Sequence, residues 1–515
     1  MSSAVRFVPE DIFISLQNTR GNSGSAYADI TRSGVLARFL REENAASAIL
    51  YWLEHVENIK EIDVKLIGPL LCRAIAAIDE LINAQVNEIL HHKTLQALEA
   101  SWRGILYLTE QAEVYDREQK VKVRVISLSW LELSKDIARA IDFDQSEFFK
   151  LIYNNEFDMP GGEPFGALIG DYQISHIIRP GQVSNDLDTL KEVARTAAAA
   201  FAPFLCAAHP SLFGVDNFSE LGQVADINNQ FKQPEYSKWR SLREMEDARF
   251  LGLVLPQVLL RSPYKDDGSR AEGFVFKESL AKPEQDYLWG NAAFAFAAVL
   301  VRAYCESGWF GQIRGMKSGS HSFGLVSGLP ACQYETDRYQ RSNKPSVSLL
   351  VSHRFEAELS DSGFIPLSAV PYSDYFAFYN NASVQQAKAS DKLVANVNHR
   401  LSAMLQYILC VARFAHYVKV IGRDKVGGYH SAQECEQDLQ RWLHKYTTAT
   451  EDASDEIRAR FPLRAAKIQV REKRGQPGHY FSIIHLQPHF QLDQMVTTVK
   501  LVAELSPKQQ TTAMA

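Results

Sequence analysis

Residues 156–172 read EFDMPGGEPFGALIGDY, and this stretch decides the class of fold. Proline restricts φ and glycine accepts backbone conformations that other residues avoid, so the run Pro160-Gly-Gly-Glu-Pro164 forces a tight, rigid turn. The turn follows a helical pattern and precedes a strand pattern. The chain therefore passes from helix to strand at this point, as expected for a mixed α/β fold.

The same alternation of helix and strand patterns extends outward over a central α/β region at residues 113–435. On the N-terminal side of the segment 156–172, residues 121–127 (VKVRVIS) alternate apolar and polar side chains, which predicts a half-buried strand. A helix is expected directly afterwards, at residues 130–141. On its C-terminal side the patterns predict an alanine-rich helix at 188–202, strands at 345–352 and 374–379, and a helix at 391–420.

Ahead of the central region, residues 46–112 carry the clearest helical periodicity in the chain. A helix at residues 70–92 has an apolar seam about two heptads long. A second helix is expected at residues 94–111. Together they predict a helical hairpin, packed internally or against the helices of a partner. The seam consists of Leu71, Ile75, Ile78, Ile82 and Ile89.

The first 45 residues differ from the rest of the chain. Val5, Arg6, Phe7 and Val8 form a candidate strand that is followed by a proline. Residues 21–25 (GNSGS) then have the glycine and serine content of a flexible linker. The pattern fits an arm with a strand at its tip, and it fits a frayed terminus equally well.

The last region, residues 436–515, contains a predicted β-hairpin at 466–487. Two β-rich runs flank a four-residue turn that holds two glycines. Apolar positions of these runs are Ile468, Val470, Phe481 and Ile483. A terminal amphipathic helix is expected at residues 493–505. Its polar face holds Asp493, Lys500 and Glu504.

Composition is that of an ordinary globular protein and excludes several functional classes. Of 515 residues, 46% are hydrophobic, and the formal net charge is −6. A nucleic-acid binder would gather a basic excess on one face, so none is expected. No apolar run is long enough to span a membrane, and charged residues stand where a signal peptide has its apolar core. We therefore expect a cytoplasmic protein without membrane insertion.

The six cysteines include no CxxC pair, which indicates free thiols in a reducing compartment. Those in apolar surroundings are expected to be buried. They are Cys72, Cys206, Cys305 and Cys410.

No catalytic, cofactor-binding or metal-binding residue is predicted. The chain has no Gly-Lys dipeptide and therefore no P-loop. The glycine-rich residues 315–328 contain Ser320 and His321, but adjacent residues do not by default face each other as a nucleophile and its base. Isolated histidine pairs such as His91 and His92 are weak signals for metal ligands.

Two helical segments carry charged residues at regular spacing. Glu99 and Arg103 are four residues apart and are expected to form an ion pair beside a packed Trp102. A second set recurs at near-helical spacing, which is typical of a solvated or partner-facing stripe. This set is Arg413, Lys419 and Arg423.

Several longer segments are more specific than composition or periodicity. They are LEASWRG at 98–104, EFDMPGGEPFGALIGDY at 156–172, AFAPF at 200–204, FLGLVLPQVLLRSPY at 250–264, WGN at 289–291, RFAHYVK at 413–419, RDKVG at 423–427 and PHFQ at 488–491. In this order and spacing the chain resembles the large sheath subunit of the type VI secretion system, the TssC/VipB (EvpB) family. The resemblance extends over residues 62–505.

This resemblance implies a phage-tail-sheath-like fold that is completed with a small partner subunit of the TssB/VipA type. It implies a structural component, not an enzyme, that needs no cofactor. Its further implied partners are copies of the same chain in a helical polymer, the Hcp inner tube, the baseplate, and the AAA+ unfoldase ClpV. Contraction of such a polymer would propel the tube out of the cell.

The sequence supports a specific hypothesis for assembly. A helical polymer needs contacts that do not close on themselves, and strand addition supplies them. We expect residues 5–8 of one subunit to extend a neighbour's sheet at the hairpin 466–487. The helical seam would pack on the partner's helices, and the polar face of the terminal helix would touch the inner tube.

Two other interpretations remain open on the sequence alone. The first 60 residues do not align with the N-terminal region of that family, which leaves room for a divergent paralogue or a baseplate-type adaptor that forms no long sheaths. A hydrolase that uses Ser320, His321 or His416 is the second alternative.

Overall fold

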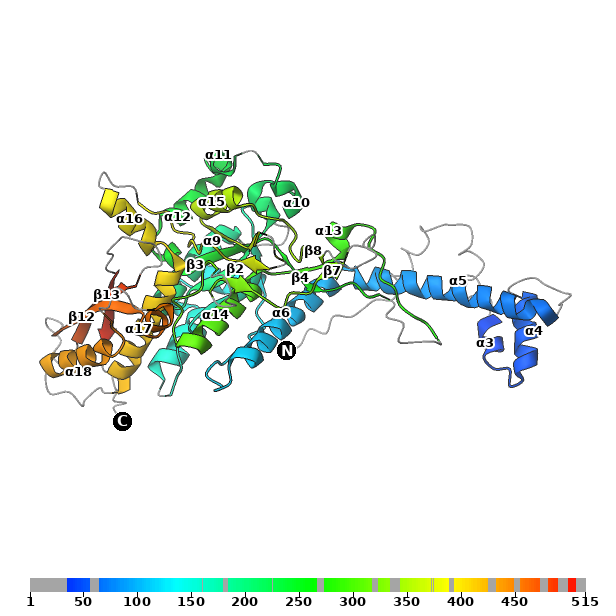
Figure 1. Ribbon diagram of the computed structural model, residues 1–515, viewed down its shortest axis with the longest axis horizontal. Helices are drawn as coiled ribbons and strands as arrows, with labels where there is room; N and C mark the ends of the chain where they lie inside the picture. Colours follow the sequence, from blue (N-terminus) through cyan, green and yellow to red (C-terminus); the bar gives the residue numbers. More distant parts are fainter. Residues whose placement is uncertain are drawn as a thin grey trace. The chain divides into compact units, whose positions relative to one another are not determined.

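The computed structural model describes residues 35–55, 64–159, 161–178, 184–224, 226–265, 273–316, 323–333, 343–371, 373, 375–388, 393–424, 432–448, 454–472, 480–489 and 499–505 (Figure 1). The chain divides into two compact units. Unit 1 comprises residues 1–96 and 263–286, and unit 2 comprises residues 97–262 and 287–515. The predicted arm strand at residues 5–8 lies outside the described residues.

Unit 1 is built from helices. They are α3 (Val35–Phe39), α4 (Ala45–His55), α5 (Val64–Leu90) and α13 (Pro283–Asp286). Trp52 of α4 and Ala74 of α5 are buried against each other, with Leu71 and Ile78 packed beside them. This small core uses part of the seam that was predicted on α5.

Unit 2 is centred on a four-stranded parallel sheet with strand order β1-β2-β3-β9. The strands are β1 (Leu168–Ile174), β2 (Phe204–Ala208), β3 (Leu251–Leu255) and β9 (Phe364–Pro366). The strands β2 (FLCAA) and β3 (LGLVL) are buried along their whole length. Continuous apolar runs are expected where helices cover both faces of a parallel sheet.

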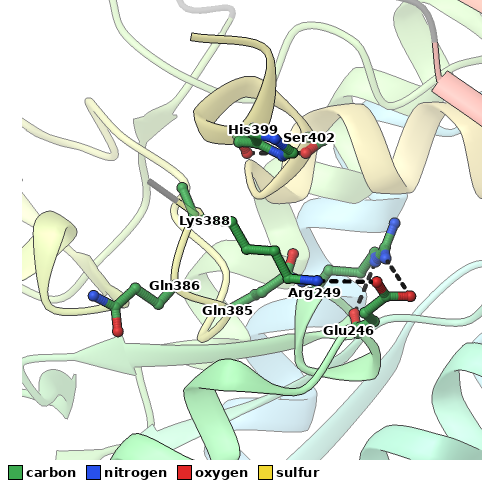
Figure 2. A pocket seen from close by; sticks show the side chains of 8 residues that line it. Glu246, Arg249, Gln385, Gln386, Lys388, His399 and Ser402 are labelled. Atoms are coloured by element: carbon green, nitrogen blue, oxygen red, sulfur yellow. Dashed lines mark hydrogen bonds and ion pairs between the residues drawn. The ribbon is translucent and has the colours of Figure 1, made fainter. Parts of the chain in front are cut away.

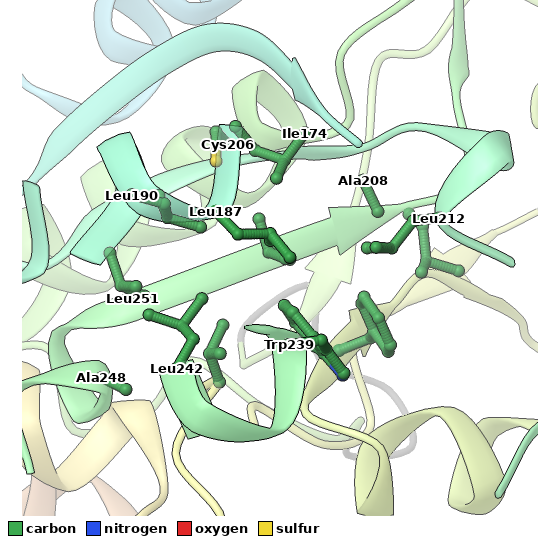
Figure 3. Close-up of a cluster of buried hydrophobic side chains, with 14 of the residues drawn as sticks. Ile174, Leu187, Leu190, Cys206, Ala208, Leu212, Trp239, Leu242, Ala248 and Leu251 are labelled. Atoms are coloured by element: carbon green, nitrogen blue, oxygen red, sulfur yellow. The ribbon is translucent and has the colours of Figure 1, made fainter. Parts of the chain in front are cut away.

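Each face of this sheet carries its own apolar core, because successive side chains of a strand point to opposite faces. Phe204 and Cys206 of β2 join the first core with α9 (Asp186–Ala199) and Trp239 of α12 (Ser237–Glu244) (Figure 3). Leu205 joins the second core with α14 (Ala293–Ser307) and Tyr107 of α6 (Lys93–Tyr115). Unit 2 is therefore a three-layer α/β structure, which confirms the mixed α/β class.

Two helices of the first layer begin with the caps that their sequences provide. Ser129 and Glu132 form a capping box at the start of α7 (Trp130–Arg139). Asn185 caps α9 by accepting a hydrogen bond from the Leu187 amide. The buried Asp186 then accepts hydrogen bonds from the Trp130 indole at 2.7 Å and from the Ser175 amide at 3.0 Å. One carboxylate thus joins α7, α9 and the end of β1.

The C-terminal part of unit 2 packs a second sheet on helices. The sheet has the order β12-β13-β14, with β12 (Leu463–Glu472), β13 (Tyr480–Pro488) and β14 (Val499–Leu505) all antiparallel. Its buried face, with Ile468, Ile484 and Leu486, packs on α17 (Leu405–Asp424) and α18 (Ala432–His444). The antiparallel pairing of β12 with β13 agrees with the strands of the predicted hairpin 466–487, whose turn lies outside the described residues.

The remaining elements connect these layers. They are η1 (Phe143–Gln145), α8 (Glu147–Phe149), η2 (Lys150–Asp158), η3 (Pro210–Phe213), α10 (Phe218–Leu221), α11 (Ile227–Gln230), η4 (Pro234–Tyr236), η5 (Asp247–Phe250), β4 (Val258–Arg261), β5 (Leu288–Gly290), β6 (Leu325–Val326), β7 (Cys332–Gln333), β8 (Asn343–Lys344), α15 (His353–Asp361), β10 (Ser368–Ala369), β11 (Phe376–Ala377), α16 (Leu393–Ser402) and α19 (Asp455–Arg460). No helix among the described residues combines the length and apolarity that crossing a membrane requires.

The terminal helix predicted at residues 493–505 is wrong for the part that the structure describes. Residues 499–505 form the strand β14, in register with β13, so that Lys500 lies opposite His485 and Glu504 opposite Phe481. The segment VKLVAEL also alternates with a period of two, and pairing with an existing hairpin decided between the two periodicities. Asp493 lies outside the described residues.

Three further predictions in the central region need correction. Residues 121–127 and 345–352 form no strand, and the predicted helix 391–420 is two helices, α16 and α17, that are separated at Ala403 and Met404. Met404 instead makes an antiparallel bridge with Ala382, which interrupts the helix. All six cysteines are free, but Cys72 is exposed and Cys305 is only half-buried, contrary to expectation, whereas Cys206 and Cys410 are buried as predicted.

Candidate assembly surfaces

Arg423 of helix α17 fixes the beginning of the segment 156–172, where η2 ends. Arg423 donates hydrogen bonds to the carbonyl oxygens of Glu156, Phe157 and Met159 at 3.1–3.4 Å. These carbonyls end η2, a π-helix, and helix ends leave carbonyl groups without partners in the helix. One guanidinium therefore caps the helix that precedes the Pro-Gly-Gly turn.

The same helix contributes an ammonium group to an aromatic cage. Lys419 Nζ lies 4.7 Å from the ring centroid of Phe201, 4.9 Å from that of Phe157 and 5.0 Å from that of Tyr153. Such distances give attraction between a cation and the faces of the rings. Arg413 lies 4.8 Å from the ring centroid of Tyr417. Arg413, Lys419 and Arg423 are therefore half-buried and bound to groups of this chain, which contradicts a solvated stripe; the alternative of a partner-facing stripe stays a prediction.

His416 lies on the same face of α17 and is fully buried. Its Nε2 donates to the Ala200 carbonyl at 2.9 Å, and its ring packs near the rings of Phe157 and Phe201. Burial, together with the positive charge of Arg413, lowers the pKa of His416 to about 3. The neutral imidazole is thus a structural group in a closed core.

Glu156 joins this junction to a second segment of the chain. Its carboxylate accepts the Glu163 amide at 2.8 Å and forms an ion pair with Arg124. Gly162 allows this close approach, because a Cβ at that position would lie 2.3 Å from the Glu156 carbonyl oxygen. Residues 161–163 therefore fold back onto the end of η2, and residues 121–127 are attached to Glu156 through Arg124.

Helix α6 presents an apolar stripe that no described residue covers. Leu98, Trp102 and Leu106 follow one another at intervals of four and are 56%, 63% and 50% exposed. The predicted ion pair between Glu99 and Arg103 is confirmed, at 2.7 Å. The prediction that Trp102 is packed is wrong within this chain. Exposed apolar residues in a row on one helix face are typical of a protein–protein contact.

The predicted seam of α5 is only partly used inside unit 1. Leu71 and Ile78 pack on the small helical core, whereas Ile75, Ile82 and Ile89 are 58%, 37% and 40% exposed. Within unit 1, the side-chain amide of Asn83 pairs with the backbone N–H and carbonyl of Lys277 at 3.0 and 2.9 Å. One side of α5 thus binds the segment around residue 277, and three seam residues face outward.

The C-terminal sheet has two edges that differ in chemistry. On the outer edge of β12, the Ile468 amide donates to Gln440 and the Val470 amide donates to Glu436, each at 2.9 Å. Gln440 also donates to the Ala466 carbonyl at 2.9 Å. Side chains of α18 therefore occupy the edge of β12. Among the described residues, no strand pairs with the outer edge of β14.

The apolar hairpin residues that were predicted to take part in strand addition between subunits fall into two groups. Ile468 and Val470 are buried against α17 and α18, so their side chains hold the sheet to its own helices. Ile483 is half-buried on the opposite face of β13, and Phe481 is paired through its backbone with Arg471 and Glu504.

The described residues form a cavity whose charged groups are paired with each other. A cavity of about 220 Å³ is lined by Glu246, Arg249, Lys388 and His399, among others. Figure 2 shows the charged groups paired with each other, since Glu246 lies 3.8 Å from Arg249 and 3.3 Å from Lys388. No group of three or more potential metal ligands occurs in the described part of the chain. Ser320 and His321 lie outside the described residues.

Comparison with known proteins identifies the architecture. Residues 72–385 match the EvpB/VC_A0108 tail sheath N-terminal domain, and residues 394–505 match the EvpB/VC_A0108 tail sheath gpW/gp25-like domain. The chain is 38% identical over 435 residues to the type VI secretion system sheath protein TssC1 of Pseudomonas aeruginosa, covering 84% of this chain and 85% of that protein. The junction between α17 and η2 joins the two matched domains, which follow one another along the chain from residue 72 to residue 505. The protein therefore belongs to the VipB/EvpB family of type VI secretion tail sheath proteins.

Proposed function

We propose that this chain is the large subunit of a contractile sheath, which forms a heterodimer with a small TssB/VipA-type subunit and polymerises helically around an Hcp tube. One observation carries the proposal: two consecutive tail sheath domains account for residues 72–385 and 394–505. The uncovered apolar rows on α5 and α6 support it further, because a subunit of an obligate assembly keeps such rows for its partners.

The helices α5 and α6 are proposed to bind the small subunit. On α5 the outward residues Ile75, Ile82 and Ile89 have helical spacing, which suits packing against another helix. Trp102 on α6 is a large aromatic residue of the type that dominates binding energy at interfaces. The helical-hairpin region at 46–112 would in this way belong to the heterodimer contact.

Neighbouring heterodimers are proposed to be linked by strand addition, with residues 5–8 of one subunit extending the C-terminal sheet of another. The difference between the two sheet edges favours β14 as the acceptor, since side chains of α18 already bind the amides of β12. Main-chain hydrogen bonds can persist while subunits rotate if the connecting linker is flexible. Residues 21–25 have the composition of such a linker.

The remaining partners follow from the sheath function. Lys500 and Glu504 on β14, together with Asp493, are proposed to face the inner tube. Contraction requires two packings of similar energy, of which the extended one is metastable. The baseplate would start the polymer, and ClpV would dismantle it after contraction. All of these events would take place in the bacterial cytoplasm, without a nucleotide or metal cofactor in this chain.

Electron microscopy of the full chain co-expressed with its small partner tests the proposal. Hollow helical cylinders are expected. A variant that lacks residues 1–20 should still co-purify with the small subunit but form no long cylinders. Discrete particles from the wild-type pair under all conditions would instead favour a baseplate-type adaptor, and normal cylinders from the deletion variant would contradict the strand-addition hypothesis.

A further inference from the structure

Residues 121–127 have the sequence of a half-buried strand but not its environment. The segment reads VKVRVIS, and every residue from Lys122 to Ser127 is exposed. Val123, Val125 and Ile126 are 41%, 61% and 47% exposed. β-branched residues in alternation favour a pleated surface that is covered on one side. The covering layer is therefore absent from this chain's described residues.

Both ends of the segment are fixed to the rest of unit 2. The Asp116 carboxylate accepts the amides of Lys120 at 2.8 Å and Val121 at 2.7 Å, and Val121 packs against the core that contains Tyr107 and Leu108. At the other end, the Tyr172 hydroxyl donates to the Leu128 carbonyl at 2.6 Å. Because its ends are held, the segment would lose little conformational entropy on binding.

One face of the segment is held as well. Lys122 Nζ donates to both carboxylate oxygens of Glu163 at 2.5 and 2.7 Å, and Arg124 pairs with the buried Glu156. The hydrogen bond and charge of Lys122 lower the pKa of Glu163. Lys122 and Arg124 alternate with Val121, Val123 and Val125. The charged residues are therefore bound to the η2 turn, while two of the three valines remain open to solvent.

The backbone of the segment has the chemistry of an open sheet edge. Among the described residues, no hydrogen bond involves an amide or carbonyl group of residues 122–127. A row of unpaired N–H and C=O groups beside apolar side chains is completed by another extended chain.

We infer that residues 121–127 form the docking edge for a β-strand of the small sheath subunit. The inference rests on the proposed function and names where that partner binds. Strand addition would pair the free backbone groups and cover Val123, Val125 and Ile126.

The position of the segment favours the small subunit over a second copy of this chain. Val121 packs in one core with Ile105 of α6, so the edge is continuous with the helix that carries the exposed Leu98, Trp102 and Leu106. A permanent heterodimer contact is expected to be large, apolar and rigid. Contacts between neighbouring copies must instead survive a rearrangement, which suits the flexible arm.

Site-specific photocrosslinking in the co-expressed full chain tests this inference. A photoreactive phenylalanine replaces Val125 in one sample and Leu350 in a matched control, because Leu350, which precedes α15, is also apolar, is 56% exposed and lies outside the proposed interfaces. Position 125 is expected to cross-link to a β-strand of the small subunit, identified by mass spectrometry, and position 350 is not. A cross-link from position 125 to residues 5–8 of a second copy, or no cross-link, would overturn the inference.

Substitution provides a second, independent measurement. V125D is expected to reduce the small subunit that co-purifies with the chain by about tenfold or more, because strand pairing would bury an unpaired carboxylate. L350D should leave co-purification unchanged, because Leu350 is exposed outside the proposed interfaces. Equal recovery with V125D and wild type would refute the docking edge. If the wild-type chain itself neither co-purified with the small subunit nor formed cylinders, the proposed function would fail instead.

Discussion

The buried His416 leads to a pH-dependence that distinguishes a structural histidine from a catalytic one. Its pKa is about 3 in the folded chain, compared with an ordinary value of 6.5. Below pH 6.5 the unfolded chain binds a proton that the folded chain excludes, so stability decreases as the pH falls from 6.5 towards 3. Each pH unit in this window corresponds to about 1.4 kcal/mol. Between pH 7.5 and pH 5.0 the expected loss from this residue is about 2 kcal/mol.

The variant His416→Gln isolates this contribution. A glutamine amide can still donate to the Ala200 carbonyl but does not titrate. Urea denaturation followed by tryptophan fluorescence is a suitable assay, because Trp309 stacks on Phe414 of the same helix, with ring centroids 4.0 Å apart. Wild type should lose about 2 kcal/mol more than the variant between pH 7.5 and 5.0.

The difference between the two proteins removes the effect of other groups. His176 and His489 also have pKa values lowered by burial, but they are present in both proteins. Parallel losses of stability in wild type and His416→Gln would refute the reasoning, because they would mean that the imidazole is accessible to protons in the folded state.

Three further substitutions test the other contacts. Lys419→Met keeps an unbranched, flexible side chain, one atom shorter, but removes the charge from the aromatic cage; we expect a loss of about 1–2 kcal/mol in denaturation, with Lys419→Arg closer to wild type. Trp102→Asp should change the stability of the chain by no more than about 0.5 kcal/mol, because the residue is 63% exposed, yet should prevent co-purification of the small subunit. Gln440→Ala removes two hydrogen bonds to β12 and should destabilise the chain by about 1–3 kcal/mol, with faster hydrogen exchange at the Ile468 amide; unchanged exchange there would contradict the assignment of this edge.

Two segments that carry the family resemblance, RFAHYVK at 413–419 and RDKVG at 423–427, have structural roles that differ from those predicted for their charged residues. Arg413, Lys419 and Arg423 were expected to form a solvated or partner-facing stripe, because charged residues at helical spacing usually mark a surface. In the structure Lys419 enters an aromatic cage, and Arg423 caps a π-helix that begins more than 260 residues earlier in the chain. Both contacts unite the two tail sheath domains.

The sequence by itself determined the local features of this protein. The passage from helix to strand within residues 156–172 and the strands of the hairpin 466–487 depend on neighbouring residues, so a pattern of a few positions predicted them. The capping box at Ser129 and the apolar runs of β2 and β3 are equally local, although they were not predicted. The family was also evident from long segments in a fixed order. Two further expectations from the sequence stay predictions: that the assembly needs no cofactor, and which proteins are its partners.

Only the tertiary structure decided which strands exist and which charges are buried. Residues 121–127 and 499–505 both alternate, yet within the described part of the chain only the latter meets a hydrogen-bonding edge, at β13. Strand formation needs a partner that is distant in sequence, and for residues 121–127 we place that partner on another subunit. The exposure of Trp102 and the burial of the α17 cations likewise depend on segments that are distant in the sequence. Periodicity indicates which side chains can share a face, but the packing of remote segments decides what that face meets.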